Sequence, residues 1–225
     1  LGWMPNGKLL VVSMRDQKLM RLGGEGLTEH ADLSRFSRHW CNDMVVDTEG
    51  GAYVGNFGFD RHVGEELRTT TLVRVEPNGE VRVAADGLMF PNGTVITPDG
   101  KTLVVAETLG GRLTSFDIDA VGNLSNRRIF AEHGGMFPDG ICLDEEGAVW
   151  VADPRNKEVV RIRDSGEMVE RIDLVDRGAY ACMLGGSDRR TLFVCTNIDS
   201  GPKTAEMKSG KIELTRVDVP GTGLP

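Results

Sequence analysis

The sequence predicts an all-β protein that folds as a β-propeller. Three observations predict this fold: one short apolar strand recurs along the whole chain, each copy follows a turn, and the copies repeat roughly every 45 residues. A repeat of that length with several short strands in each unit is typical of propeller blades.

The recurring strand has continuous apolar character, as expected for a strand covered on both faces. Turns such as PNGK and PDGK precede the copies and place Gly or Asp where tight reversals favour them. Shorter and more alternating segments follow, which indicates outer strands with one face in water. The five copies are KLLVVS (8–13), GAYVGN (51–56), TLVVAE (102–107), AVWVAD (148–153) and TLFVCT (191–196).

We therefore expect a single domain over residues 1–225 that is divided into five units. The first unit lacks the strand that opens the others. Because open sheet edges invite aggregation, the pattern leaves two alternatives: five blades that close on themselves, or a ring from which an upstream blade is missing. The units are 1–38, 39–85, 86–132, 133–178 and 179–225.

The composition excludes some classes of partner. The 225 residues carry a formal net charge of -8, with 26 basic residues scattered along the chain, so we expect no binding to nucleic acid. No apolar run approaches the roughly 20 residues that cross a bilayer, and no secretory signal opens the chain. The sequence therefore predicts a soluble, cytoplasmic protein that binds no membrane.

The four cysteines fit that compartment. They show no C-x-x-C spacing, and Cys142 and Cys195 lie within apolar strand-like runs, so we expect buried, reduced thiols. The cysteines are Cys41, Cys142, Cys182 and Cys195.

A second strand precedes four of the turns and opens near a polar or small residue. Aligning CNDMVVD, PNGTVIT, PDGICLD and ACMLGGS gives the anchors Asn42, Asn92, Asp139 and Ala181, spaced by 50, 47 and 42 residues. Equivalent positions at the ends of inner strands converge on a propeller axis. Carboxylate and amide oxygens suit hard cations such as Ca²⁺, Mg²⁺ or Mn²⁺. Asn-Asp, Asn-Gly and Asp-Gly are also ordinary turn dipeptides, so repetition for folding alone is the alternative.

Several of these segments resemble the senescence marker protein/gluconolactonase family, the regucalcin-like lactonases. The resemblance runs along essentially the whole chain and rests on NDMVVDTEGGAYVGNFGFD, PNGTVITPDGKTLVVAET, MFPDGICLDEEGAVWVADP, ACMLGGSDRRTLFVCT and the closing VPGTGLP. It implies a six-bladed propeller of which this chain covers about five blades, the first being absent. It also implies one divalent metal on the axis and hydrolysis of the ester bond of a sugar lactone or a related lactone.

The same resemblance assigns the metal ligands residue by residue. The Asn of the N-D-x-x-x-D stretch corresponds to Asn42, that of P-N-G to Asn92, and the Asp of P-D-G to Asp139. A fourth ligand, a Glu, lies in the family's first blade, which precedes Leu1. An Arg that often lies two residues before the first Asn is replaced here by Trp40. The expected cofactor is one divalent ion, Ca²⁺ first, with Mn²⁺, Mg²⁺ and Zn²⁺ as alternatives.

Asp139 is the expected general base for lactone hydrolysis, because it is the only ionisable member of the three anchors. Asn56 and Asp60 are weaker candidates for contacts with the substrate. Glu107 follows an inner strand, and we expect it to be a solvated carboxylate at a strand end. The histidines show no ligand spacing and are interpreted as surface or packing residues.

Two other functions remain open alongside a lactonase that acts on a small molecule. One is a non-catalytic propeller that binds a divalent metal. The other is an interaction scaffold that binds a protein through loops such as residues 59–70.

Overall fold

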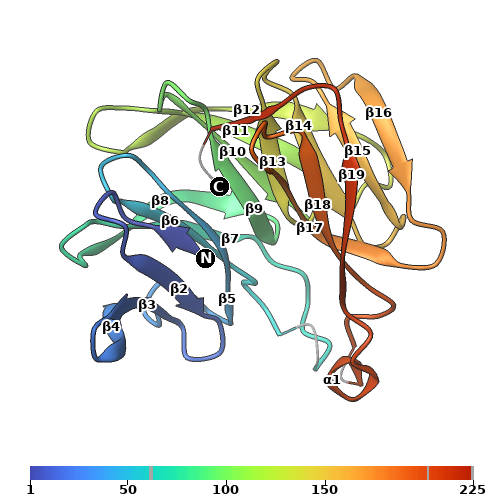
Figure 1. Ribbon diagram of the computed structural model, residues 1–225. Helices are drawn as coiled ribbons and strands as arrows, with labels where there is room; N and C mark the ends of the chain where they lie inside the picture. Colours follow the sequence, from blue (N-terminus) through green and yellow to red (C-terminus); the bar gives the residue numbers. More distant parts are fainter. Residues whose placement is uncertain (61–62, 202, 224–225) are drawn as a thin grey trace.

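The structure, a computed structural model, describes residues 1–60, 63–201 and 203–223, and over these residues it is an all-β propeller of five blades (Figure 1). Each blade is an antiparallel sheet whose strands follow one another in chain order. The one helix in the described ranges is the short α1 (Thr204–Met207). No helix there is long and apolar enough to cross a membrane.

The first three blades each contain four strands. Blade 1 consists of β1 (Gly2–Trp3), β2 (Leu9–Ser13), β3 (Lys18–Gly23) and β4 (Gly26–Asp32). Blade 2 consists of β5 (Cys41–Val46), β6 (Ala52–Asn56), β7 (Thr70–Val75) and β8 (Val81–Leu88). Blade 3 consists of β9 (Pro91–Ile96), β10 (Thr102–Glu107), β11 (Arg112–Ile118) and β12 (Leu124–Glu132).

The last two blades share the C-terminal segment. Blade 4 consists of β13 (Ile141–Asp144), β14 (Val149–Asp153), β15 (Glu158–Ile162) and β16 (Met168–Asp173), and blade 5 of β17 (Gly178–Gly185), β18 (Thr191–Asn197) and β19 (Lys211–Arg216). The final strand β20 (Gly221–Thr222) leaves blade 5 and pairs with β13. A Cβ on Gly221 would lie 2.4 Å from the Cβ of Leu184, so this crossing requires a glycine.

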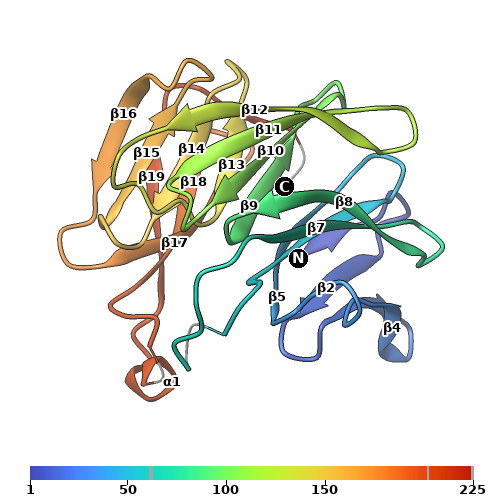
Figure 2. The same cartoon turned by 180° about the vertical axis from the view of Figure 1, so that it is seen from behind.

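The five units expected from the repeat are confirmed. The first unit does have an innermost strand, β1, although it is only two residues long. Middle strands such as β14 and β15 are buried along their whole length, whereas the outermost strand β16 has no buried residue. Figures 1 and 2 place β4 and β16 at the periphery of the molecule, seen from the two sides. The difference between inner and outer strands therefore follows their distance from the axis.

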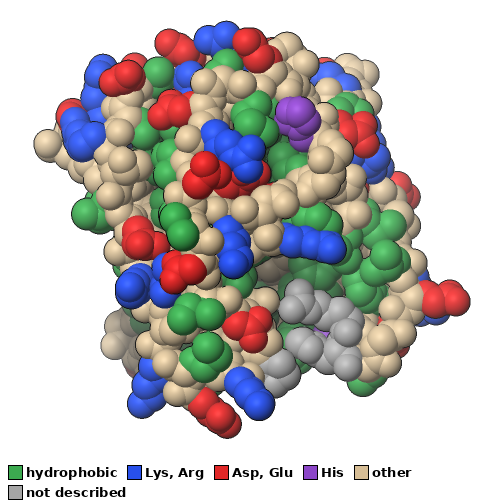
Figure 3. All heavy atoms as spheres, turned by 90° about the vertical axis from the view of Figure 1, so that its right-hand side faces the viewer, with side chains coloured by type: hydrophobic (Ala, Val, Ile, Leu, Met, Phe, Trp, Pro, Cys, Tyr) green, Lys and Arg blue, Asp and Glu red, His purple; other side chains and the backbone are tan. Residues whose placement is uncertain are grey.

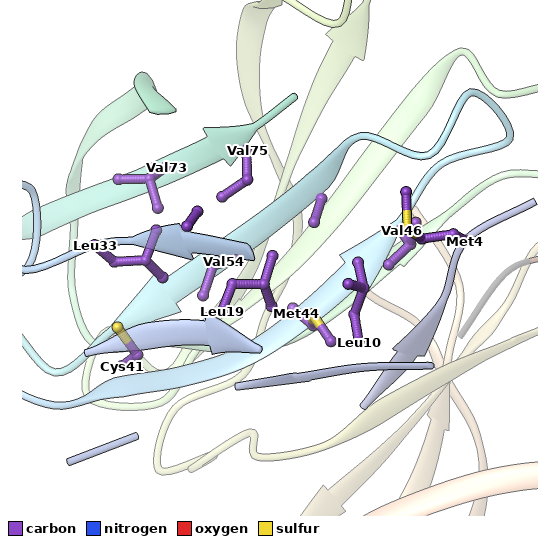
Figure 4. Packing of buried hydrophobic residues seen from close by; sticks show 12 residues of the cluster. Met4, Leu10, Leu19, Leu33, Cys41, Met44, Val46, Val54, Val73 and Val75 are labelled. Carbon is purple, nitrogen blue, oxygen red and sulfur yellow. The ribbon is translucent and has the colours of Figure 1, made fainter. Parts of the chain in front are cut away.

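The hydrophobic core is divided among the spaces between neighbouring blades. Figure 4 shows the cluster between blades 1 and 2, where Leu10 and Leu19 meet Met44 and Val54. Equivalent clusters join blades 2 and 3, blades 3 and 4, and blades 4 and 5. Among the described residues, no core cluster joins blade 5 to blade 1. Four interfaces therefore hold five blades together.

The outward faces of the two end blades carry exposed apolar side chains. On blade 5, Ile212 and Leu214 are 67% and 63% exposed, and on blade 1, Trp3 and Leu27 are 55% and 53% exposed. Cys195 lies beside Ile212 on this face of blade 5 and is exposed, which corrects the expectation that it is buried. Its strand is apolar, but no neighbouring blade covers that side.

The other three cysteines are buried, and all four are free thiols. The expectation of reduced cysteines therefore agrees with the structure. Acidic and basic side chains are interspersed on the face seen in Figure 3, without a continuous basic area.

Inner strands of adjacent blades approach so closely at the axis that only glycine fits. A Cβ on Gly93 would lie 2.5 Å from the Ile141 nitrogen and 2.6 Å from the Asp139 oxygen. Both atoms belong to backbone, so neither can move aside without moving blade 4. The Gly93 N–H instead donates to the Asp139 carbonyl, at 3.2 Å.

We predict that Gly93→Ala lowers the free energy of unfolding by more than about 2 kcal/mol, because the added methyl group forces blades 3 and 4 apart. Urea unfolding followed by tryptophan fluorescence measures the change. Gly134→Ala is the matched control, because no atom lies within 4 Å of its added Cβ. Equal stability of the two variants would contradict this account of the axis.

Candidate functional site

The three expected ligands lie on successive blades, at or just before the beginning of the inner strands. In blade 2, Cys41 pairs with Asn56 but Met44 pairs with Val54, so Asn42 lies within a β-bulge. In blade 3, Pro91 pairs with Glu107 and Thr94 with Val105, which places Asn92 within the equivalent bulge. Bulges redirect side chains and often border functional sites.

Hydrogen bonds between blades bring these positions together. The Asn42 amide nitrogen donates to the Pro91 carbonyl at 3.1 Å, immediately before Asn92. The backbone bond from Gly93 to Asp139 continues the series to blade 4. Asn42, Asn92 and Asp139 are therefore neighbours around the axis, as the repeat predicts.

The bond from Gly140 N–H to the Tyr180 carbonyl, at 3.0 Å, repeats the bond from Gly93 to Asp139. It identifies Tyr180 as the fourth equivalent position and corrects the sequence alignment, which used Ala181. The pairing of Ala179 with Thr196 gives the same register, because it matches that of Pro91 with Glu107. An alignment of the apolar residues Ile141 and Cys182, made without requiring a polar anchor, would have assigned Tyr180 to this position.

The orientation of both amides follows from their partners. A carbonyl only accepts, so the atom of Asn42 that meets Pro91 is the amide nitrogen. Thr108 donates its hydroxyl proton to the Pro138 carbonyl at 2.6 Å, so it accepts from the Asn92 amide nitrogen at 3.1 Å. The carbonyl oxygens of Asn42 and Asn92 accept no hydrogen bond from the described residues. Both oxygens are therefore available as ligands.

Asp139 lies at the beginning of blade 4 and is partly exposed. Its backbone N–H donates to Ala152 at 2.9 Å, which fixes the main chain at this point. Two residues earlier, the Phe137 ring lies under the guanidinium of Arg155, whose Cζ is 4.2 Å from the centre of the ring. A cation is thus held beside the loop that carries the carboxylate.

Buried carboxylates at the ends of the second strands hold the loops that precede Asn92 and Asp139. Glu107 is fully buried, and its Oε2 accepts from the Met89 N–H at 2.7 Å. Asp153 occupies the same place in blade 4 and accepts from the Phe137 N–H at 2.7 Å. The repeated sequence Met-Phe-Pro-Asn/Asp-Gly therefore forms a loop in which a backbone N–H donates a hydrogen bond to a buried carboxylate.

Burial disfavours the charge on Glu107, but the hydrogen bonds from Arg112, Thr114 and the Met89 N–H outweigh it and lower the pKa of this carboxyl. Arg112 and Arg127 form ion pairs with it at 2.9 and 3.1 Å. This corrects the expectation of a solvated carboxylate. The sequence alone does not reveal this ion pairing, because an acidic residue at the end of a strand gives the same pattern whether water or an arginine is its partner.

An aromatic cluster supports the loop before Asn92. Phe90 has a φ of 59°, which is unusual for a residue other than glycine, and its ring stacks on Phe57 with centres 4.4 Å apart. Phe59 also contacts it, and all three rings are buried. Strained backbone of this kind persists where the surroundings determine it, often at functional sites.

The two residues expected to contact substrate lie in different environments. Asn56 is fully buried; its amide donates to the Thr71 carbonyl at 2.8 Å and its oxygen accepts from Thr70. A contact between Asn56 and a substrate would require these surroundings to open. Asp60 is partly exposed, and its Oδ2 lies 3.3 Å from the His39 Nε2.

His39 itself stacks on Trp40, with ring centres 5.0 Å apart, which agrees with a packing role. Of the loop over residues 59–70, Arg61 and His62 lie outside the described residues.

A narrow cavity of about 120 Å³ continues inward from the anchors between the inner strands. Leu1, Asp43, Thr94, Ile141 and Met183 are among its lining residues. No three His, Cys, Asp or Glu side chains of the described ranges come together as a metal site. The expected ligand set contains only one such side chain.

A cavity of about 910 Å³ lies at the opposite ends of the inner strands. Its walls are turns of blades 2 and 3, and the buried Arg74 forms part of them. Arg74 is already engaged by Asp47 at 2.7 Å and Glu76 at 3.1 Å, over the ring of Tyr53. These charges hold turns of blade 2 together, and the cavity does not include the anchors.

Comparison with known proteins finds relatives over most of the chain. The family model described as SMP-30/Gluconolactonase/LRE-like region matches residues 1–198. A 6-deoxy-6-sulfogluconolactonase from Pseudomonas putida is 30% identical over 210 residues, covering 90% of this chain and 69% of that protein. Regucalcin from Xenopus laevis is 30% identical over 189 residues, covering 80% of this chain and 63% of that protein.

A solved structure shares the fold. The calcium-binding protein regucalcin from Agrobacterium tumefaciens superimposes with a TM-score of 0.79 at 23% identity, covering 100% of this chain and 77% of that one. The chain thus spans about two thirds of the length of the two curated relatives above.

We predict that Glu107→Gln lowers the free energy of unfolding at pH 7 by about 2 to 3 kcal/mol, because two arginines lose their buried partner. Folding lowers the pKa of Glu107 below its ordinary 4.5, so its contribution is complete above that pH and is lost as the pH falls through the folded value. The stability difference from the unchanged protein should therefore shrink below about pH 4.

Urea unfolding at a series of pH values measures this difference. Glu170→Gln is the control, because Glu170 is exposed on β16. A difference that stays constant down to pH 3 would contradict the role given to the Glu107 charge.

Proposed function

This chain belongs to the SMP-30/Gluconolactonase/LRE-like family, and from that membership we propose that it hydrolyses the ester bond of a sugar lactone or a related lactone. The activity named for the Pseudomonas putida relative supports the reaction class. The observation that carries the proposal is the orientation of the anchors: two amide carbonyl oxygens and one carboxylate belong to equivalent positions of adjacent blades.

The anchors fit a hard divalent cation. Their donor atoms are all oxygens. Pro91 of the neighbouring blade holds the amide nitrogen of Asn42, and Thr108 of the same blade holds that of Asn92. Ca²⁺ is the first candidate because it takes carboxylate and amide oxygens readily. Mn²⁺ and Mg²⁺ share that preference, whereas Zn²⁺ more often takes nitrogen and sulfur. When bound, such an ion supplies Lewis-acid polarisation of the lactone carbonyl and a water of lowered pKa.

Within this scheme the protein's own groups have distinct roles. Asn42 and Asn92 orient the cation through their carbonyl oxygens. Asp139 accepts the proton of the attacking water, since it is the ionisable member of the set. Asp60, partly exposed beside His39, accepts a hydrogen bond from a substrate hydroxyl. Asn56 acts on the site indirectly, through its bonds to Thr70 and Thr71 on β7.

The propeller is of the six-bladed type in this proposal. The exposed apolar faces of blades 1 and 5 support it, because a further blade would cover Trp3 on one side and Ile212 and Leu214 on the other. The family's additional Glu ligand would belong to that blade. Two of the curated relatives are longer than this chain, which is consistent with a further blade.

A non-catalytic metal-binding propeller is the second candidate. The description of the regucalcin from Agrobacterium tumefaciens as a calcium-binding protein favours it. The two functions differ in whether the bound ion keeps a position open for water.

We predict that lactone hydrolysis disappears with a chelator, returns with Ca²⁺ or Mn²⁺, and falls about 1,000-fold in Asp139→Asn, because the variant loses the base. A pH-stat assay over sugar and aliphatic lactones measures the rates. Asp164→Asn is the control, because Asp164 is an exposed turn residue.

A second readout separates binding from turnover. Ca²⁺ should raise the melting temperature of the unchanged protein and of Asp164→Asn, but not that of Asp139→Asn. Full activity of Asp139→Asn would contradict the mechanism. A calcium-dependent shift without any lactone hydrolysis would favour the non-catalytic propeller.

A further inference from the structure

Tyr180 completes the ring of equivalent positions at the mouth of the channel. It follows Ala179, which pairs with Thr196 as Pro91 pairs with Glu107, and its carbonyl receives the bond from Gly140. A register irregularity lies between Ala179 and Ala181, so Tyr180 lies within a bulge as Asn92 does. Four blades therefore present a polar side chain at one shared position.

The hydroxyl of Tyr180 is not used by the fold. The side chain is half-buried, and its hydroxyl makes no hydrogen bond with the described residues and is not enclosed. The only other tyrosine, Tyr53, is fully buried and donates to the Gly122 carbonyl at 2.9 Å. A tyrosine hydroxyl that is buried in a protein usually has a hydrogen-bond partner. A hydroxyl without one, on the residue whose backbone position is equivalent to the anchors, is open to a ligand.

Its chemistry differs from that of the other three positions. Asn42 and Asn92 have amide oxygens that accept no hydrogen bond from the described residues, and Asp139 supplies a carboxylate; these acceptors suit a cation and a water proton. Tyr180 supplies an O–H donor. When a lactone opens, the atom that needs a proton is the ring oxygen, because it leaves as an alkoxide.

We propose that Tyr180 is a catalytic residue of lactone opening that donates its hydroxyl proton to the leaving ring oxygen. This inference rests on the proposed function. Water adds to the acyl carbon and gives one proton to Asp139; the acyl carbon–oxygen bond then breaks, and its electron pair goes to the ring oxygen. That oxygen takes the phenol proton, the phenolate recovers a proton from solvent, and Asp139 releases the proton it took from water to solvent. One water is consumed and one hydroxy acid is released.

The test compares two lactones whose leaving groups differ. δ-Valerolactone releases an alkoxide, which needs a proton, whereas dihydrocoumarin releases a phenolate, which is stable without one. In Tyr180→Phe, kcat/KM should fall about 100-fold on δ-valerolactone and less than about 3-fold on dihydrocoumarin. Both rates are measured on one preparation, so their ratio does not depend on the fraction that is folded.

Tyr53→Phe is the matched control, because it removes the same atom from a buried site away from the anchors. It should leave the ratio of the two rates unchanged. Equal loss on both lactones in Tyr180→Phe, or no loss on either, would overturn the role of Tyr180 while leaving the lactonase intact. If the unchanged protein hydrolyses neither of these lactones nor any sugar lactone, it is the proposed function that fails.

Discussion

The close approach of inner strands at the axis is the constraint on which the rest of this structure depends. Blades 3, 4 and 5 are joined there by backbone hydrogen bonds from Gly93 to Asp139 and from Gly140 to Tyr180. A Cβ on Gly140 would lie 2.7 Å from the Ala181 Cα, so this contact too requires a glycine. The glycines that follow Asn92 and Asp139 therefore serve the fold, and by drawing the blades together they bring the side chains before them into one site.

Buried carboxylates next to the site fix the loops that carry the anchor side chains. Glu107 and Asp153 each accept a hydrogen bond from the loop that leads to an anchor. Thr108 then connects blade 3 to blade 4 by accepting from Asn92 and donating to Pro138. Because the Pro91 carbonyl can only accept and the Thr108 proton is already donated to Pro138, the amide nitrogens of Asn42 and Asn92 must face these partners, which fixes the orientation of both amides. Such supporting contacts decide how well a ligand set is preorganised.

Much of the fold could be predicted from the sequence, because blades repeat and repetition is visible in one chain. The positions of Asn42, Asn92 and Asp139 could be found for the same reason. The register of Tyr180 could not be found from polarity alone, since its bulge is defined by pairing with β18. The burial of Glu107 and the exposure of Cys195 depend on which neighbour covers each strand. Neither the arginines around Glu107 nor the open face of blade 5 is a local property of the sequence.

The central claim is that three side chains from three blades hold one cation. The most direct measurement is anomalous X-ray scattering from crystals of the protein grown with Mn²⁺. We expect one strong peak on the axis about 2.0 to 2.6 Å from the carbonyl oxygens of Asn42 and Asn92 and from the Asp139 carboxylate. A peak held by other carboxylates, with these three side chains directed apart, would contradict it.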